Sequence, residues 1–215
     1  MLIWGRKDAF PGADGSTVTL TTGAVTTIPI YGADGNALTE NGTGLKFINI
    51  TTLGVINNNA LVYSIKNPLS IIYNTTSPQD WYSNTDTHNN SLCLPSRKTN
   101  YDPCPSGWRL PSEEIWFDFL TNDKFPYYSQ GVQQESSTGY YATNGRLYAQ
   151  LTWFPISGCR PSISGLVSEC GKTCYYWTAT PLDNNSKYFA LTFNKANIGE
   201  GGHRAGGLSV RCVQE

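Results

Sequence analysis

The sequence has few of the residues on which most catalytic and metal sites depend. Its 215 residues include only two histidines and one methionine. No Gly-x-Ser-x-Gly, His-Glu-x-x-His or phosphate-loop pattern occurs, and these motifs mark many hydrolases, zinc peptidases and nucleotide-binding enzymes. Glu113 and Glu114 are adjacent carboxylates, but neighbouring residues of a helix face different directions. We therefore expect a protein that is not an enzyme and that uses no metal or cofactor.

Charge and long apolar runs are also scarce. Charged residues make up 14% of the chain, and the formal net charge is -1. A protein that binds nucleic acid or an anionic membrane surface usually carries a concentrated basic region. A transmembrane helix needs a run of about 20 apolar residues, and the sequence has none. We expect neither a nucleic-acid partner nor direct insertion into a membrane.

The first residues, Met1 to Trp4, lack the charged and apolar regions of a signal peptide. The six cysteines nevertheless contain no pair of Cys-x-x-Cys knuckles, so disulfides of an exported protein explain them better than a zinc site does. We expect an extracellular or cell-surface protein that has lost a leading segment. The alternative is a component of a particle, such as a phage, that bypasses the export signal.

The sequence is rich in glycine and aromatic residues, with 21 Gly, 13 Tyr and 6 Trp. Aromatic and threonine residues favour strands, while glycine and asparagine favour turns, so we predict an α+β fold with short antiparallel sheets, about two helices and long loops. One domain should span residues 1–215. Its N-terminal part, residues 5–60, is predicted to consist of strands and turns, because Asp-Gly turns at 12–15 and 32–35 flank alternating apolar and threonine residues.

Residues 60–72 have apolar positions compatible with a short helix, which Pro68 would bend or restart. The polar stretch 74–94 is predicted to be a long ordered loop, in which His88 is exposed and is not a metal ligand. Residues 101–116 are predicted to pass from a cysteine-anchored turn through a short strand into a helix capped by Ser112.

Three stretches near the C-terminus alternate in polarity and are predicted to be neighbouring strands: 175–180, 188–193 and 208–213. The segments between them, 181–187 and 194–207, are polar and are predicted to be loops. Loops on a rigid sheet commonly carry binding specificity. The predicted ligand contacts are Tyr175, Asp183, Asn184, Asn185, Lys187, Tyr188, Asn194, Asn197, His203 and Arg204, with Tyr140 and Tyr141 at the rim.

Several blocks of the sequence resemble one family when they are taken in their fixed order. The blocks are Trp4-Gly-Arg-Lys-Asp-Ala-Phe-Pro11, Ser64-Ile-Lys-Asn-Pro68, Asp80-Trp81, Asp102-Pro-Cys-Pro-Ser-Gly-Trp-Arg-Leu-Pro-Ser112 with Trp116, Tyr175-Tyr-Trp-Thr-Ala-Thr180 and Leu208-Ser-Val-Arg-Cys-Val213. They resemble the Fibrobacter succinogenes major paralogous domain family of gut Bacteroidetes surface proteins. The resemblance implies a C-type lectin-like fold and a cell-surface or fimbrial-tip location.

The resemblance also implies a disulfide between Cys104 and Cys212, since the family tends to carry both cysteines. The pairing of Cys93, Cys159, Cys170 and Cys174 stays open, although a local bridge among the last three is expected from their closeness in sequence. Formylglycine-generating enzymes share part of the fold and use two cysteines to bind copper. Cys170 and Cys174 have neither the spacing nor the flanking residues of that pair, so an oxidase is the less favoured alternative.

The predicted function is therefore that of an extracellular module that binds or adheres to a surface glycan or protein through its C-terminal loops. A structural subunit of a pilus, phage tail or virion is the alternative. Calcium-dependent sugar binding is not predicted, because the Glu-Pro-Asn and Trp-Asn-Asp motifs of C-type lectins are missing. The resemblance adds the hypothesis that a diversity-generating retroelement varies Asn184, Asn185, Asn194 and Asn197, since asparagine codons are rich in adenine.

Overall fold

The computed structural model of the chain describes residues 1–10, 30–31, 37–38, 46–55, 59–85, 89–120, 127–130, 134–135, 141–142, 145–149, 151–192 and 195–215. This part of the chain contains two helices, α1 (Ala60–Lys66) and the 3-10 helix η1 (Glu113–Phe119). The strands of its first half are β1 (Leu2–Ile3), β2 (Ile30–Tyr31), β3 (Ala37–Leu38), β4 (Lys46–Asn49), β5 (Ser70–Tyr73) and β6 (Trp108–Arg109). Those of its second half are β7 (Tyr127–Gln130), β8 (Gln134–Glu135), β9 (Tyr141–Ala142), β10 (Gly145–Tyr148), β11 (Thr152–Pro155), β12 (Thr173–Leu182), β13 (Asn185–Thr192), β14 (Ala196–His203), β15 (Gly207–Leu208) and β16 (Val213–Gln214).

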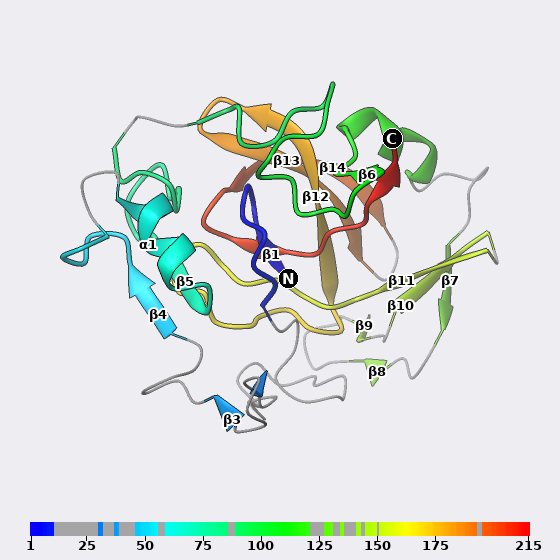
Figure 1. Cartoon of the computed structure of the whole chain (residues 1–215). Helices are drawn as coiled ribbons and strands as arrows, with labels where there is room; N and C mark the ends of the chain where they lie inside the picture. Colours follow the sequence, from blue (N-terminus) through cyan, green and yellow to red (C-terminus); the bar gives the residue numbers. More distant parts are fainter. Residues whose placement is uncertain are drawn as a thin grey trace.

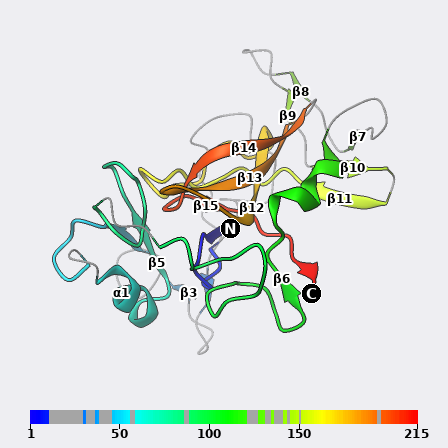
Figure 2. The same cartoon turned by 90° about the horizontal axis from the view of Figure 1, so that it is seen from above.

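The longest strands form an antiparallel sheet in the order β12-β13-β14, drawn in orange tones in Figure 1. Seen from above, this sheet lies between the α1 and β5 region on one side and strands β10 and β11 on the other (Figure 2). Most of the other strands are short and pair antiparallel, and β4 and β5 form a parallel pair. The coarse prediction of a mixed fold with few helices and many short antiparallel strands is confirmed.

One face of this sheet packs on a cluster of aromatic side chains. Trp116 of η1 stacks on Phe189 of β13, with ring centroids 4.5 Å apart and planes at 3°. Phe154 and Tyr176 complete the contact with Trp116 from β11 and β12. Offset and edge-to-face ring pairs add to the stabilisation that area burial alone provides, so η1 is fixed by its single buried tryptophan.

Three buried tryptophans link the N-terminal segment to the same sheet. The indole nitrogen of Trp4 donates to the carbonyl of Thr178 at 3.0 Å, and that of Trp177 donates to the carbonyl of Leu2 at 3.0 Å. Trp81 donates in turn to the carbonyl of Trp4 at 2.8 Å. Because each of these three indole N–H groups has an acceptor, the three side chains occupy the core without an unsatisfied donor. The N-terminal segment is therefore fixed to β12, and Trp81 is fixed to that segment.

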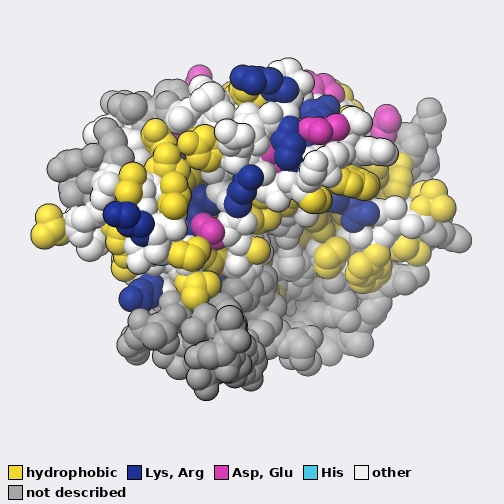
Figure 3. All heavy atoms as spheres, viewed as in Figure 1, with side chains coloured by type: hydrophobic (Ala, Val, Ile, Leu, Met, Phe, Trp, Pro, Cys, Tyr) yellow, Lys and Arg dark blue, Asp and Glu magenta, His cyan; other side chains and the backbone are white. Residues whose placement is uncertain are grey.

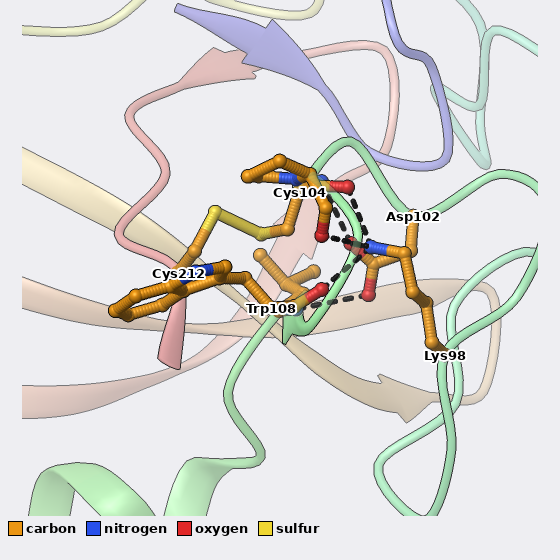
Figure 4. The surroundings of a disulfide bond; sticks show 7 residues. Lys98, Asp102, Cys104, Trp108 and Cys212 are labelled. Carbon is orange, nitrogen blue, oxygen red and sulfur yellow. Dashed lines mark hydrogen bonds and ion pairs between the residues drawn. A yellow bond between two sulfur atoms is a disulfide. The ribbon is translucent and has the colours of Figure 1, made fainter. Parts of the chain in front are cut away.

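Cys104 and Cys212 form a disulfide, which confirms the predicted pair. Figure 4 shows the ammonium of Lys98 beside this bond, where it donates to the carbonyl oxygens of Cys104 at 2.5 Å and Trp108 at 2.6 Å. The carboxylate of Asp102 accepts from the backbone N–H of Cys104 at 2.8 Å and of Leu110 at 2.9 Å. The turn that carries Cys104 is thus held by charge-assisted hydrogen bonds as well as by the disulfide.

Two predictions for the C-terminal region are wrong in detail. The segment 194–207, predicted to be a loop, contains strand β14. The segment 208–213, predicted to be the third strand, has named strands only at its two ends, and between them Ser209 forms a β-bridge with Tyr176 of β12. Glycine-rich β14 is a strand because the side chains of neighbouring strands fill the space above it, as described below. A sequence pattern of alternating apolar residues cannot reveal such a strand.

The central segment follows the prediction with two differences. Helix η1 begins after Ser112, as expected, but the Ser112 hydroxyl makes no cap hydrogen bond. The first N–H of the helix, that of Glu113, donates instead to the hydroxyl of Thr180 on β12 at 3.1 Å. The short strand predicted here is β6, and the apolar residues around it are not equally buried: Trp108 is 44% exposed, whereas Leu110 is 1% exposed.

Among the described residues, the two helices are too short to cross a membrane. On the face shown in Figure 3, apolar side chains gather over the α1 region, and Lys and Arg side chains are scattered among acidic ones. Leu53, Val62 and Ile65 are the exposed apolar residues in and near α1.

Candidate functional site

The predicted contact residues do not form one surface. The structure places Tyr175, Tyr188 and Asn197 on one face of the β12-β13-β14 sheet, and Asp183, Asn184, Asn185 and His203 at the end of the β12-β13 hairpin. Lys187 and Arg204 are engaged elsewhere, as described below. Asn194 and Tyr140 lie outside the described residues, and Tyr141 is in β9.

Strand register brings the two tyrosines together on the face opposite the Trp116 cluster. Tyr175 pairs with Ala190, which pairs with Asn197, and the next row of the same face is Trp177, Tyr188 and Gly199. The rings of Tyr175 and Tyr188 meet edge to face, with centroids 5.2 Å apart and planes at 87°. Both side chains are half-buried. We use the name tyrosine face for the surface formed by Tyr175, Tyr188, Asn197 and Glu169, which accepts a hydrogen bond from Tyr175.

Two glycines of β14 make room for the Tyr188 ring. A Cβ atom added to Gly199 would lie 2.0 Å from Cε2 of Tyr188, and one added to Gly202 would lie 2.7 Å from its Cδ1 and 2.8 Å from Cζ3 of Trp177. Real Cβ atoms do not approach other atoms so closely. The ring therefore lies directly over the backbone of β14, and any larger residue at either glycine would displace it.

Glu169 joins these tyrosines, although no sequence pattern predicted it. The hydroxyl of Tyr175 donates to Oε2 of Glu169 at 2.9 Å. Glu169 reaches this position because Ser168 pairs with Cys159 and because its carbonyl accepts from the N–H of Lys172, which turns the chain into β12. Its φ of +60° is uncommon for a residue other than glycine. Nothing in the spacing of the cysteines signals this pairing.

Burial raises the pKa of the Tyr175 phenol, and the adjacent Glu169 carboxylate raises it further. The pKa of Tyr188 is also raised, again mainly by burial, with contributions from Cys159 and Glu169. Both phenols therefore stay neutral and keep their hydrogen-bond donors well above physiological pH. The tyrosine face presents two neutral rings, an amide and one carboxylate.

The hairpin end is a tight turn, which is shorter than the polar loop predicted over residues 181–187. Asp183 and Asn184 alone separate β12 from β13, and Asp183 has a φ of +47°. Asn185 pairs with His203 across the sheet, and Nδ1 of His203 lies 3.1 Å from Oδ1 of Asn185. These residues are polar and accessible, but they lie at the far end of the strands from Tyr175.

Lys187 and Arg204 have structural partners. Lys187 lies on the face opposite to Tyr188 and forms an ion pair of 2.7 Å with Glu113 of η1. Arg204 is fully buried, with its guanidinium 4.4 Å from the centroid of the Trp4 ring and 3.9 Å from Asp80. It donates to the carbonyls of Asp183 and Asn185, which fixes the hairpin end. Arg204 thus has no surface to offer a ligand in this structure.

Four cysteines are free thiols, so the local bridge expected among Cys159, Cys170 and Cys174 is not present. Cys174 points into the Trp116 cluster, whereas Cys170 is half-buried and its thiol donates to the carbonyl of Ser157 at 3.3 Å. Burial raises the pKa of Cys93, Cys159 and Cys174 to about 12. A thiol with such a pKa is a poor nucleophile at neutral pH.

Within the described ranges, no three His, Cys, Asp or Glu side chains lie close enough together to hold a metal ion. Comparisons of the chain with protein-family models, with curated proteins and with solved structures gave no match. The candidate site therefore depends on the geometry of the tyrosine face.

Proposed function

We propose that the protein is a non-catalytic ligand-binding module that acts outside the cell and contacts a glycan or a protein through the tyrosine face. The observation that carries the proposal is the fixed pair of half-exposed rings, Tyr175 and Tyr188, flanked by Glu169 and Asn197. Tyrosine gives a large contact area for little lost side-chain entropy, which is why it dominates many binding surfaces.

The surroundings support this proposal, because both edges of the strand that bears Tyr175 are paired. Tyr175 pairs with Ala190 of β13 on one side, and its carbonyl accepts from the N–H of Ser209 at 2.9 Å on the other. A surface that is already ordered loses little entropy when a ligand binds.

The fold family, the cellular location and the sequence variation that the family resemblance implies belong to the same proposal. A C-type lectin-like fold agrees with the order of the sequence blocks and with the disulfide that joins Cys104 to Cys212. A surface or fimbrial-tip location in Bacteroidetes, or a phage particle, follows from the same resemblance. Retroelement variation of Asn184, Asn185, Asn194 and Asn197 is tested by sequencing the locus, where a near-copy template repeat is expected downstream.

The test of the function is a glycan and protein array probed with the whole chain. We expect a ligand whose binding falls at least about tenfold when Tyr175 and Tyr188 are both changed to alanine, because two central aromatic contacts are removed. The control is Glu113→Ala, which lies on the opposite face of the sheet. Binding that survives the tyrosine changes but is lost in Asn184→Ala would move the contact surface to the hairpin end.

A structural subunit is the second candidate, and one observation favours it. Within the described residues, β14 is the last strand of its sheet, so its outer backbone edge has no paired strand there. An open strand edge can pair with another chain. This candidate predicts that the arrays stay empty while the protein forms ordered assemblies at high concentration, which light scattering and electron microscopy would detect.

A further inference from the structure

The tyrosine face carries a charge that the described part of the chain does not neutralise. Glu169 is exposed, and the ion pairs between described residues involve other carboxylates, those of Asp8, Asp80, Asp102 and Glu113. A carboxylate beside two aromatic rings is therefore left available to a ligand.

The carboxylate of Glu169 lies beside the ring pair, on the side of Tyr175. The Tyr175 hydroxyl donates to Oε2 of Glu169 at 2.9 Å, so the carboxylate lies at the rim of the ring pair. The rings stand at 87° to each other, which presents the edge of one ring beside the face of the other. The face of an aromatic ring is negative and attracts cations, most strongly where water is partly excluded.

This arrangement is held by the fold and does not depend on a ligand. Gly199 and Gly202 leave the space in which the Tyr188 ring lies. The carbonyl of Glu169 accepts from the N–H groups of Lys172 and Thr173 at 3.0 and 3.2 Å, which keeps its backbone in the uncommon positive-φ region. Unusual backbone conformations that the surroundings enforce are concentrated at functional sites.

We propose that the tyrosine face binds an ammonium group, which packs against the rings of Tyr175 and Tyr188 and pairs with the carboxylate of Glu169. This inference rests on the proposed function and names the chemistry that the ligand carries. A lysine side chain of a protein partner and an amino sugar of a glycan both supply a protonated amine. The cations of the predicted contact set do not compete for Glu169, because Lys187 is paired with Glu113 and Arg204 is buried.

The competing interpretation is a neutral sugar that stacks on the same rings and ignores the carboxylate. Charge is the variable that separates the two. The probes are therefore two pairs that differ at one nitrogen: glucosamine against N-acetylglucosamine, and Nα-acetyl-lysine methylamide against its Nε-acetylated form. The first pair represents a glycan source and the second a protein source.

Each probe is titrated into the isotope-labelled whole chain, and the backbone amide signals of residues 169, 175 and 188 are followed by NMR. We expect the amine member of at least one pair to shift these signals with a dissociation constant of about 1 to 10 mM, as is usual for fragments. The acetylated member should bind at least about fivefold more weakly, and added salt should weaken only the amine.

The matched variants are Glu169→Gln and Glu113→Gln. Glutamine at position 169 keeps an oxygen that can accept from Tyr175 but removes the charge, so amine binding should fall by about tenfold. The same change at Glu113, on the opposite face, should leave it within about twofold.

Equal binding of the charged and neutral members, no binding of any probe, or an unchanged affinity in Glu169→Gln would overturn the inference. If array binding still requires Tyr175 and Tyr188 in that case, the proposed function stands without it. If array binding is independent of both tyrosines as well, both proposals fail. If the inference holds, the pair of probes whose amine member binds identifies the source of the ammonium group, which is a glycan or a protein.

Discussion

Removal of the disulfide between Cys104 and Cys212 should destabilise the protein mainly through its unfolded state. The two cysteines are 108 residues apart in the sequence. Closing a loop of this length removes chain entropy that corresponds to about 5 kcal/mol at 25 °C. The turn of Cys104 should keep its conformation, because Lys98 and Asp102 hold it by hydrogen bonds of their own.

The assay is urea unfolding of the Cys104→Ala/Cys212→Ala variant, followed by tryptophan fluorescence. With a urea dependence of about 2 to 3 kcal/mol per molar, the midpoint should fall by about 2 M. Reduction of the wild-type protein should lower the midpoint similarly and should not affect the variant. The control Cys170→Ser, which removes a free thiol, should stay within about 0.3 M of the wild type. A decrease in the urea midpoint of less than about 0.4 M would refute the reasoning. Loss of the near-UV circular dichroism of the variant in the absence of urea would also refute it.

Three further predictions concern the packing and ionisation of the core. Gly199→Ala should displace the Tyr188 ring and lower the free energy of urea unfolding by about 1 to 3 kcal/mol. In a Tyr188→Ala background most of that loss should disappear, and additive effects of the two changes would contradict the clash. Arg204→Met should cost at least about 3 kcal/mol, because a buried cation near Asp80 is removed and the carbonyls of Asp183 and Asn185 lose its hydrogen bonds. The exposed control His203→Ala should cost under about 1 kcal/mol. Similar midpoints for the two variants would show that the buried guanidinium contributes little. The three buried thiols have a pKa of about 12 in the folded state and 9.0 when unperturbed, so the unfolded state loses these protons first. The stabilisation from these thiols should therefore be fully present below pH 9, and the free energy of unfolding should fall between pH 9 and 12 by on the order of 4 kcal/mol per pH unit. Cys174→Ala should reduce that slope by about a third, and an unchanged slope would argue against the raised pKa of Cys174.

The parts of the fold that local sequence signals determine were predictable. The helix at 60–66 and the helix start after Ser112 follow from apolar spacing and from a proline-serine boundary. The alternating strands around Tyr175 and Tyr188 were also predicted, although β12 extends further at both ends. The pairing of Cys104 with Cys212 came from the family resemblance and not from spacing.

The rest depended on contacts between residues distant in the sequence. The segment with Gly199 and Gly202 was predicted to be a loop. It is a strand because rings from β12 and β13 pack over it, and these rings come close to it only when the sheet forms. Arg204 was predicted to be a contact because it lies in a polar stretch, yet the fold buries it against the ring of Trp4 and near Asp80, which is 124 residues earlier in the sequence. Glu169 was missed for the same reason, since the backbone β-bridge between Cys159 and Ser168 brings it next to Tyr175.

The disulfide and the tyrosine face are physically connected through one short segment. Ser209 accepts from the N–H of Trp177 at 3.0 Å and donates to the carbonyl of Tyr175 at 2.9 Å, and Cys212 follows three residues later. The disulfide therefore anchors the segment that pairs with the outer edge of β12. Because β13 holds the other edge, loss of the disulfide should loosen residues 210–215 before it disturbs the rings. Hydrogen exchange on the reduced protein should then rise first in that segment, and faster exchange at Tyr188 than at residues 210–215 would contradict this order.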